Sequence, residues 1–581
     1  MNFLKNMLAA LVALIIFSVV GFFIILGVFS ALSAEKPVEV EANSVLHLKL
    51  DRPIDEVEQQ NPLEELFPVA PEILGLVQVK EAIAKAKSDD NIKGIYLDAP
   101  ILMAGIATVE ELRQALIDFK SEGKFVVSYG EFYTEGAYYL ASVADKIYLH
   151  PEGSLEINGL AANLAFFKGM FDKLEIEPQV FRVGDFKSAV EPFIREDMSE
   201  ENRTQLRSLL NSVNDQMMNN MAKSRNMTLE QVQEISSKML VRNPQDAKEL
   251  AMVDDLLYLD QVKDQLKELV GTGEEDELEM ISYSNYRKSY SSYKSSRNKV
   301  AVIVASGDIV PGKGDMDNVG SDKFAKEIRK ARENDDIKAI VMRINSPGGS
   351  FIASDVMWRE LKLASEVKPV IASMSDVAAS GGYYLAMACD TIMAQPNTIT
   401  GSIGIFSIIF NAQGFLNNKL GVTTDEVATG EISTLYTMSR PLSEEQKRII
   451  QKDTDEGYET FVTKAAEGRG MSVDDIKAIA SGRVWSGLQA LDNGLIDQLG
   501  GIDDAIALAA EKAGVADDYK VRYYPEKKPF LEQLLSDLEG EAKTKFMKEE
   551  LSDLYPYLRQ YEKVKNLRGL QARLPFELRL E

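Results

Sequence analysis

The second half of the chain alternates short apolar runs with stretches of helical periodicity. Residues 300–304, 339–343 and 370–372 are rich in β-branched and other apolar side chains, which is typical of strands buried on both faces. Residues 321–333 and 353–365, which lie between them, repeat apolar positions at the spacing of an amphipathic helix. This alternation predicts parallel β-α-β units in an α/β fold.

A long uncharged segment stands at the N-terminus. Residues 7–32 contain no charged side chain, and 26 residues at about 1.5 Å each exceed a hydrocarbon core of about 30 Å. Lys5 precedes the segment and glutamates follow it, so the positive-inside tendency puts the N-terminus in the cytoplasm and the rest outside. We predict one transmembrane anchor over residues 1–35. The alternative is a cleaved signal peptide ending near residues 31–34 (ALSA), but the apolar segment is long for one.

Composition limits the chemistry that the chain can carry. A length of 581 residues predicts two to four domains. Asp and Glu outnumber Lys and Arg by 90 to 65, and the resulting charge of −25 opposes binding to nucleic acid. The single cysteine, Cys389, excludes an intramolecular disulfide, and His47 and His150 are too few for a His-rich metal cluster. We expect no metal and no cofactor.

The most informative pattern is an internal repeat. Residues 91–95 (NIKGI) resemble residues 336–340 (DIKAI), an offset of 245 positions. Residues 136–141 (GAYYLA) match residues 381–386 (GGYYLA) at the same offset. Constant spacing over this length of chain indicates two copies of one domain.

The repeat and the local composition divide the chain into further parts. Residues 44–270 are the first copy and residues 299–520 the second, with a linker at 271–298 that includes an extended segment. Residues 521–581 are predicted to be a C-terminal helical extension. One face of that extension carries a stripe for packing or oligomer contacts, made of Leu531, Leu534, Leu535 and Leu538.

Three glycine-rich elements in the second copy are candidates for chemistry. They are residues 345–350 (NSPGGS), 379–383 (ASGGY) and 400–404 (TGSIG). Paired glycines at a strand end let the backbone approach a ligand and turn N–H groups toward it, as an oxyanion hole requires. Each element alone is equally compatible with a tight turn.

Together, these elements resemble the Clp-protease/crotonase superfamily. The closer resemblance is to the signal peptide peptidase A family in its long, tandem-repeat form (the protease IV family). Its most specific pieces are SPGG at residues 346–349, TGSIG at residues 400–404 and GDFKSAVEPF at residues 184–193. The resemblance covers the chain after the anchor. It implies a crotonase-like fold in each copy, a Ser–Lys dyad and a homotetramer at the membrane.

The same resemblance assigns roles to six residues. They are the nucleophile Ser402, the general base Lys187, the oxyanion-hole residues Gly349 and Ile403, the supporting Gly348, and Thr424, whose hydroxyl hydrogen-bonds the lysine.

The repeat supports one site shared between the copies. The offset of 245 places Ile157 opposite Ser402, so the first copy lacks the nucleophile. In the later region the offset is 246, and Lys187 falls opposite Ser433, so the second copy lacks the lysine. Complementary halves are expected of a duplicated enzyme with one full site across the domain interface.

A lysine base requires a pKa far below its usual value of about 10.4, which burial against an apolar wall provides. Glu191 would raise that pKa if it paired with Lys187, so we expect Glu191 to point away. Three other serines in glycine-rich turns compete for the role of nucleophile, namely Ser346, Ser350 and Ser380. Both histidines are expected to have surface or packing roles.

We therefore predict a membrane-anchored serine endopeptidase of the bacterial inner membrane, with its catalytic domains on the extracytoplasmic side. The resemblance implies that it degrades remnant signal peptides and similar apolar peptides in or near the membrane. One alternative is a crotonase-like acyl-CoA enzyme, which the anchor and the lack of an evident basic pocket oppose. The other is a catalytically inactive membrane scaffold, which loss of Ser402 or Lys187 would have favoured.

Overall fold

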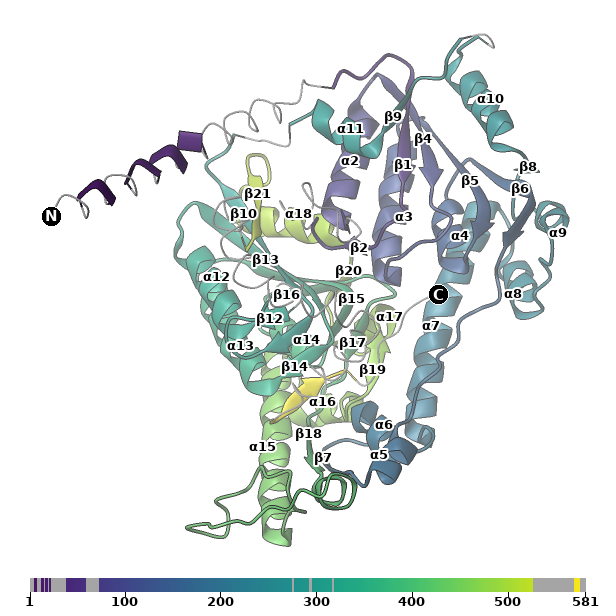
Figure 1. Ribbon diagram of the computed structural model, residues 1–581. Helices are drawn as coiled ribbons and strands as arrows, with labels where there is room; N and C mark the ends of the chain where they lie inside the picture. The colour runs from purple at the N-terminus through teal and green to yellow at the C-terminus, as the bar shows by residue number, and fades with distance from the viewer. Residues whose placement is uncertain are drawn as a thin grey trace.

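Two sheet-based halves joined by a third sheet make up the molecule in the computed structural model (Figure 1). The structure describes residues 38–525 except 59–72, 274–275, 292–294 and 316–317, then residues 569–574, and short helical pieces between residues 5 and 21.

The first copy is built on a parallel six-stranded sheet in the order β8-β6-β5-β4-β1-β9. Its strands are β1 (Ser44–Lys49), β4 (Ile92–Asp98), β5 (Phe125–Tyr133), β6 (Lys146–Leu155), β8 (Asp255–Leu256) and β9 (Met280–Ser282). The main helices are α2 (Leu76–Ser88), α3 (Ile106–Lys120), α4 (Glu135–Ala141), α7 (Glu200–Arg225), α8 (Leu229–Ser237), α9 (Pro244–Glu249) and α10 (Leu259–Val270). Leu46, Leu48 and Ile95 are fully buried in the core beneath them.

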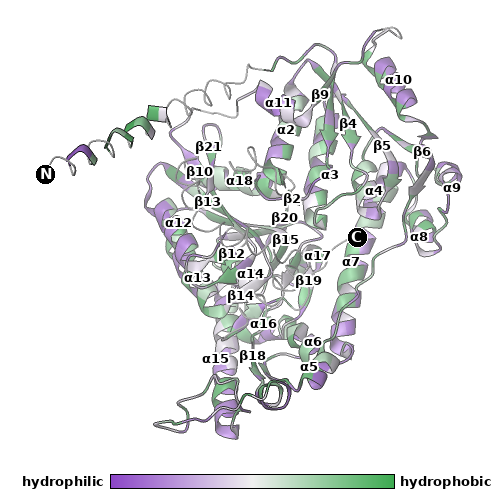
Figure 2. Cartoon of the chain, in the orientation of Figure 1, coloured by the Kyte–Doolittle hydropathy of each residue, from purple (hydrophilic) through white to green (hydrophobic). Residues whose placement is uncertain are grey.

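The second copy has an eight-stranded sheet, in which β19-β17-β15-β13-β10-β21 is the main path. Beside this path, β16 pairs with β15, and β20 pairs with β16. Its strands are β10 (Lys299–Ser306), β13 (Ile337–Ser346), β15 (Val370–Ala379), β16 (Thr391–Ala394), β17 (Ile399–Gly401), β19 (Val484–Ser486), β20 (Gln498–Leu499) and β21 (Lys520–Tyr524). Its helices are α12 (Ser321–Glu333), α13 (Phe351–Ser365), α14 (Gly381–Ala386), α15 (Glu444–Arg469), α16 (Val473–Ile479), α17 (Gly487–Asp492) and α18 (Ile502–Lys512). The strands and helices predicted for this copy are confirmed, and α12 shows the predicted polar outer face (Figure 2).

The duplication is visible in the sheet topology. The order β20-β16-β15-β13-β10-β21 in the second copy repeats β8-β6-β5-β4-β1-β9 in the first. Helices α7 and α15 are both 26 residues long, and a serine hydroxyl, from Ser199 or Ser443, caps the start of each. The chain is thus a mixed α/β protein with a duplicated domain.

The third sheet contains strands from both copies in the order β12-β11-β14-β22-β18-β7. Only β7 (Glu177–Arg182) comes from the first copy, and it pairs antiparallel with β18 (Phe406–Asn411). The remaining strands are β11 (Asp308–Val310), β12 (Asn318–Gly320), β14 (Gly348–Ser350) and β22 (Gln571–Arg573). The pairing of β7 with β18 fixes the lower parts of the two copies against each other (Figure 1).

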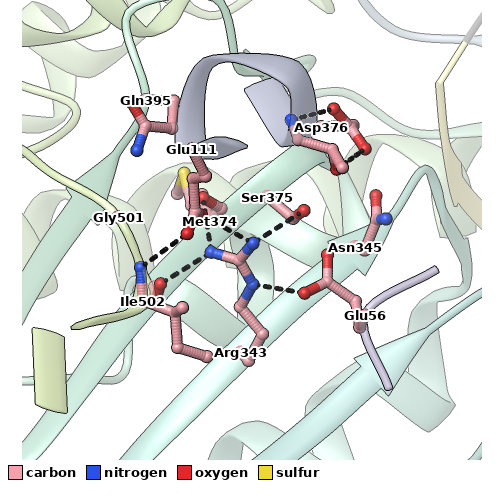
Figure 3. Close-up of polar contacts among 12 residues, drawn as sticks. Glu56, Glu111, Arg343, Asn345, Met374, Ser375, Asp376, Gln395, Gly501 and Ile502 are labelled. Carbon is pink, nitrogen blue, oxygen red and sulfur yellow. Dashed lines mark hydrogen bonds and ion pairs between the residues drawn. The ribbon is translucent and has the colours of Figure 1, made fainter. Parts of the chain in front are cut away.

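A buried ionic network also holds the copies together (Figure 3). Arg343 on β13 lies 2.7 Å from Glu56 and 2.8 Å from Glu111, both of the first copy, and all three side chains are almost fully buried. Burial alone would raise the pKa of Glu111, but Arg343 and Lys80 lower it to about 2. Nearby, Asp376 accepts hydrogen bonds from the N–H and hydroxyl of Thr108 in the first turn of α3.

Two of the predictions concern segments at the ends of the chain. The predicted anchor over residues 1–35 and the leucine stripe of residues 531–538 lie mostly or wholly outside the described residues. Among the helices that the structure does describe, none has the length and apolar character needed to cross a bilayer. In the predicted linker, β9 extends the first sheet and α11 (Tyr283–Ser289) follows it.

Candidate active site

The pairing of β7 with β18 brings Lys187 to Ser402. Arg182 at the end of β7 is opposite Phe406 at the start of β18, and the N–H of Val183 still donates to the carbonyl of Ile405. The chain after β7 therefore runs alongside the chain before β18. Lys187 lies five residues after Arg182 and Ser402 four residues before Phe406, so both reach the same place.

A loop between α16 and β19 holds the two segments together. The N–H of Phe186 donates to the carbonyl of Ser481 at 3.0 Å, and the N–H of Ser402 donates to the carbonyl of Arg483 at 2.7 Å. Between them, Gly482 has φ +79°, and a Cβ added to it would lie 2.6 Å from the Cβ of Lys187. Sequence reasoning missed this loop, although a Ser-Gly pair before a strand is a turn signal.

The amine of Lys187 is buried and contacts three serine oxygens. Nζ lies 3.1 Å from Ser402 Oγ, 2.9 Å from Ser380 Oγ and 3.2 Å from the Ser402 carbonyl oxygen. The side chain has no exposed surface, and this burial lowers the pKa of Lys187 well below its usual value, because a buried ammonium loses its hydration. A neutral amine beside a hydroxyl can accept its proton.

Glu191 does point away from the lysine, as the sequence suggested. It is fully buried, but its carboxylate accepts hydrogen bonds from the N–H and hydroxyl of Ser199 and from the amide of Asn202. The acid thus stabilises the start of α7 instead of the charged form of the lysine.

Both serines at the lysine have unusual backbone conformations. Ser402 has φ +50° and Ser380 has φ +54°, and residues with a Cβ rarely adopt positive φ. The N–H of Ser380 donates to the carbonyl of Gly401 at 2.8 Å, so the two turns hold each other in place. Strain of this kind collects at functional sites, where the surrounding structure imposes it.

The other two competing serines have structural contacts. The hydroxyl of Ser346 donates to the carbonyl of Gly307 at 2.6 Å and accepts from the N–H of Gly348 at 3.2 Å. The hydroxyl of Ser350 accepts from the N–H of Ala353 and caps α13. Only Ser380 remains beside Ser402 at the lysine.

The two predicted oxyanion-hole residues lie in different segments of the second copy. Gly349 is in β14, where it is opposite Ile309 on one side and Ala572 on the other. Ile403 directly follows Ser402; its side chain is buried, and its carbonyl accepts from the N–H of Gly482 at 2.8 Å. Gly348, the supporting residue, has φ +97°.

The structure does not bring Thr424 or either histidine to this place. Thr424 lies in an exposed loop, whereas Lys187 is buried, and Ser380 supplies the second hydroxyl at the lysine instead. His47 pairs with Asp98 at 3.1 Å, and His150 packs its ring against Tyr258. Within the described parts of the chain, no group of three His, Cys, Asp or Glu side chains is arranged to hold a metal ion.

Comparison with known proteins agrees with the duplicated fold. The model of a family described as peptidase family S49 matches the chain twice, over residues 118–273 and 362–516. The first range covers most of the first copy and ends just past it, and the second lies in the second copy, so the family's domain is duplicated in this chain.

Relatives match across both copies. "Protease 4" of Haemophilus influenzae is 33% identical over 496 residues, covering 82% of this chain and 80% of its own length. "Protease 4" of Salmonella typhi is 37% identical over 478 residues, covering 81% and 76%. "Serine protease SPPA, chloroplastic" of Arabidopsis thaliana is 37% identical over 456 residues, covering 77% and 67%. The chain belongs to peptidase family S49, as a serine peptidase of the Protease 4 and SPPA type.

Proposed function

We propose that the chain is a Ser–Lys dyad endopeptidase in which Ser402 is the nucleophile and Lys187 the general base. One observation carries this proposal, the 3.1 Å contact between Ser402 Oγ and the fully buried Nζ of Lys187. A serine hydroxyl needs a base to become an effective nucleophile, and neither histidine lies at this site.

The reaction follows from this geometry. Lys187 takes the hydroxyl proton as Ser402 Oγ attacks the peptide carbonyl, and then gives that proton to the leaving amine. The ester that remains on Ser402 is released when Lys187 accepts a proton from an attacking water. The N–H groups of Gly349 and Ile403 stabilise the negative charge that develops on the carbonyl oxygen, and the turn at Gly348 orients the first of them.

Ser380 orients the amine in this proposal. Its hydroxyl, 2.9 Å from Nζ, gives the amine a second hydrogen-bond partner besides Ser402 and so holds the lysine in position. Ser402 rather than Ser380 is the nucleophile because Ser402 stands in the motif of residues 400–404 that resembles the family pattern and directly precedes Ile403.

The substrates, location and assembly of the enzyme are part of the same proposal. Its substrates are remnant signal peptides and similar apolar segments, and residues 7–32 anchor it in a bacterial inner membrane with both crotonase-like copies outside the cytoplasm. The anchor concentrates the enzyme where such peptides lie. The domain limits are those given by the sequence, and the assembly is a homotetramer.

A set of variants tests the dyad. Hydrolysis of a fluorogenic peptide with an apolar P1 residue is measured for the wild type, Ser402→Ala, Lys187→Ala and Ser380→Ala. Lys173→Ala, an exposed lysine of the first copy, is the matched control. We expect losses of at least about 10³-fold for Ser402→Ala and Lys187→Ala, and a smaller loss with a shifted pH profile for Ser380→Ala. Full activity of Ser402→Ala would contradict the proposal.

A further inference from the structure

Gln205 is a fully buried polar residue of the first copy that the proposed reaction does not use. It lies in the second turn of α7, and its side chain has no exposed surface. A buried amide without hydrogen-bond partners destabilises the fold, so such groups are nearly always bonded. Both polar atoms of this side chain have partners. The places to which these bonds run indicate what the residue does.

The amide nitrogen of Gln205 holds the chain on both sides of Lys187. Nε2 donates to the carbonyl of Phe186 at 3.1 Å and to the hydroxyl of Ser188 at 2.8 Å. That hydroxyl in turn donates to Oδ1 of Asn202, one turn earlier on α7, at 3.0 Å. The backbone of Lys187 therefore lies between two points that α7 fixes.

The amide oxygen of Gln205 reaches the second copy. Oε1 accepts from the N–H of Val484 at 3.3 Å. Val484 begins β19, where it is opposite Gly401, the residue directly before Ser402. The carbonyl of Arg483, on the other side, accepts from the N–H of Ser402 at 2.7 Å. One side chain thus joins the segment of the lysine to the strand that holds the serine.

Two other side chains on the same face of α7 also contact the second copy. The hydroxyl of Ser212 lies 2.7 Å from that of Ser486, and the hydroxyl of Ser208 accepts from the amide of Gln489 at 3.0 Å. Positions 205, 208 and 212 are neighbours on one helix face, which lies along β19 (Figure 1). Among the hydrogen bonds of the described residues, those of Gln205 also extend to the lysine segment, and those of the two serines stay at β19 and α17.

The repeat agrees with a role tied to the lysine. Helices α7 and α15 follow the capping residues Ser199 and Ser443, so Gln205 falls opposite Ile449, six residues after the cap in each copy. An isoleucine side chain forms no hydrogen bonds. The amide is therefore present in the copy that supplies the lysine and absent from the copy that lacks it. Packing of such a long helix does not itself require an amide at this position.

We infer that Gln205 is a positioning residue, which holds the segment of Lys187 against the strand beside Ser402 and so sets the separation of amine and hydroxyl. This inference rests on the proposed function. Gln205 bonds to the neighbours of the two reacting residues and acts through them. A misplacement of about 1 Å can lower a rate by about 10²-fold. Loss of the amide should therefore lower kcat and leave KM, which depends on contacts with the peptide, nearly unchanged.

Steady-state kinetics of Gln205→Met test the inference, because methionine has a similar length and no amide. The full chain hydrolyses the fluorogenic peptide with an apolar P1 residue. Ser208→Ala and Ser212→Ala are matched controls, since each removes one hydroxyl from the same helix face. We expect kcat of Gln205→Met to fall by about 10- to 100-fold with KM changed by less than about twofold. Both constants of the two control variants should stay within about twofold of the wild type.

A second background separates positioning from a general effect on the fold. In Lys187→Ala the amine is absent, so adding Gln205→Met should lower the remaining rate by less than about twofold. An equal loss in both backgrounds would overturn the inference, as would an unchanged kcat of Gln205→Met or an equal loss in Ser212→Ala. If Gln205→Met does not fold, as judged by thermal unfolding, Gln205→Asn takes its place with the same expectations, because its amide is one methylene too short to join the two segments.

The same measurements keep the two proposals apart. Full activity of Lys187→Ala would contradict the dyad, whatever the Gln205 variants do. Loss of activity in Lys187→Ala together with an unchanged kcat of Gln205→Met would leave the dyad in place and overturn the role given to Gln205.

Discussion

The amine of Lys187 lies 3.1 Å from the hydroxyl of Ser402, although 215 residues separate them in the chain. Each residue comes from a different copy of the duplicated domain, and the antiparallel pairing of β7 with β18 brings them together. Neither copy alone contains both groups. The two copies of the domain therefore share a single candidate active site.

Activity should rise with pH through the pKa of Lys187. Burial lowers that pKa well below 10.5, and only the neutral amine can accept the serine proton, so kcat/KM increases as the pH passes upward through the folded-state pKa. Lys187→Arg keeps the charge at every pH and should be inactive throughout. The profile is measured between pH 5 and pH 10 with Lys173→Arg as control. A profile for Lys187→Arg with the same rising limb as the wild type would exclude Lys187 as the base.

Removing the buried amine should stabilise the fold. Because the folded-state pKa of Lys187 is lowered, the unfolded chain binds more protons between that pKa and 10.5, and stability rises with pH in this window. Lys187→Met should therefore raise the free energy of unfolding by about 1–3 kcal/mol near pH 7, and by less at pH 10. Urea denaturation at the two pH values checks this. A less stable variant at pH 7 would show that the lysine's contacts outweigh its burial.

Gly482 should be needed to hold Lys187 beside Ser402. Its φ of +79° disfavours a side chain, and a Cβ there would lie 2.6 Å from Lys187, so Gly482→Ala should displace the amine from Ser402. A displacement of about 1 Å is expected to lower kcat by about 10²-fold. Gly421→Ala is the matched control, because Gly421 has φ +68° with open space around it. Equal activities of the two variants would contradict the role given to this loop.

The ionic network between the copies should contribute strongly to stability. Arg343→Met leaves Glu56 buried without its partner and leaves Glu111 with Lys80 alone, which is expected to cost about 3–5 kcal/mol. Arg448→Ala removes an exposed ion pair with Glu445 and should cost less than about 1 kcal/mol. Thermal unfolding of both variants makes the comparison. A similar, small change in Tm for both would show that the network is not needed to join the copies.

Much of the fold could be predicted from local pattern and from the repeat. The helix of residues 321–333 was predicted because its apolar spacing and its packing agree, and the offset of 245 anticipated the matching strand orders. Ser402 and Lys187 were predicted from the resemblance of their motifs to a known family. The repeat supported them, because each copy lacks the residue that the other copy contains.

The parts that could not be predicted depend on contacts between distant segments. The distance between Ser402 and Lys187 depends on the register of β7 on β18, which no local pattern specifies. Ser380 was considered only as a rival nucleophile, because its place at the amine arises from folding. Strand β22 has three residues and is a strand only because two sheet edges face it. Arg343, a charge at the end of an apolar run, was a visible sign of the network.

Trapping the covalent intermediate tests the central claim most directly. The full chain is incubated with a serine-reactive peptidyl phosphonate, digested, and examined by mass spectrometry for the modified residue. We predict modification at Ser402 in the wild type, and at least about 10²-fold slower modification in Lys187→Ala, because the hydroxyl then lacks its base. Modification at Ser380 instead, or equal rates with and without Lys187, would contradict the dyad.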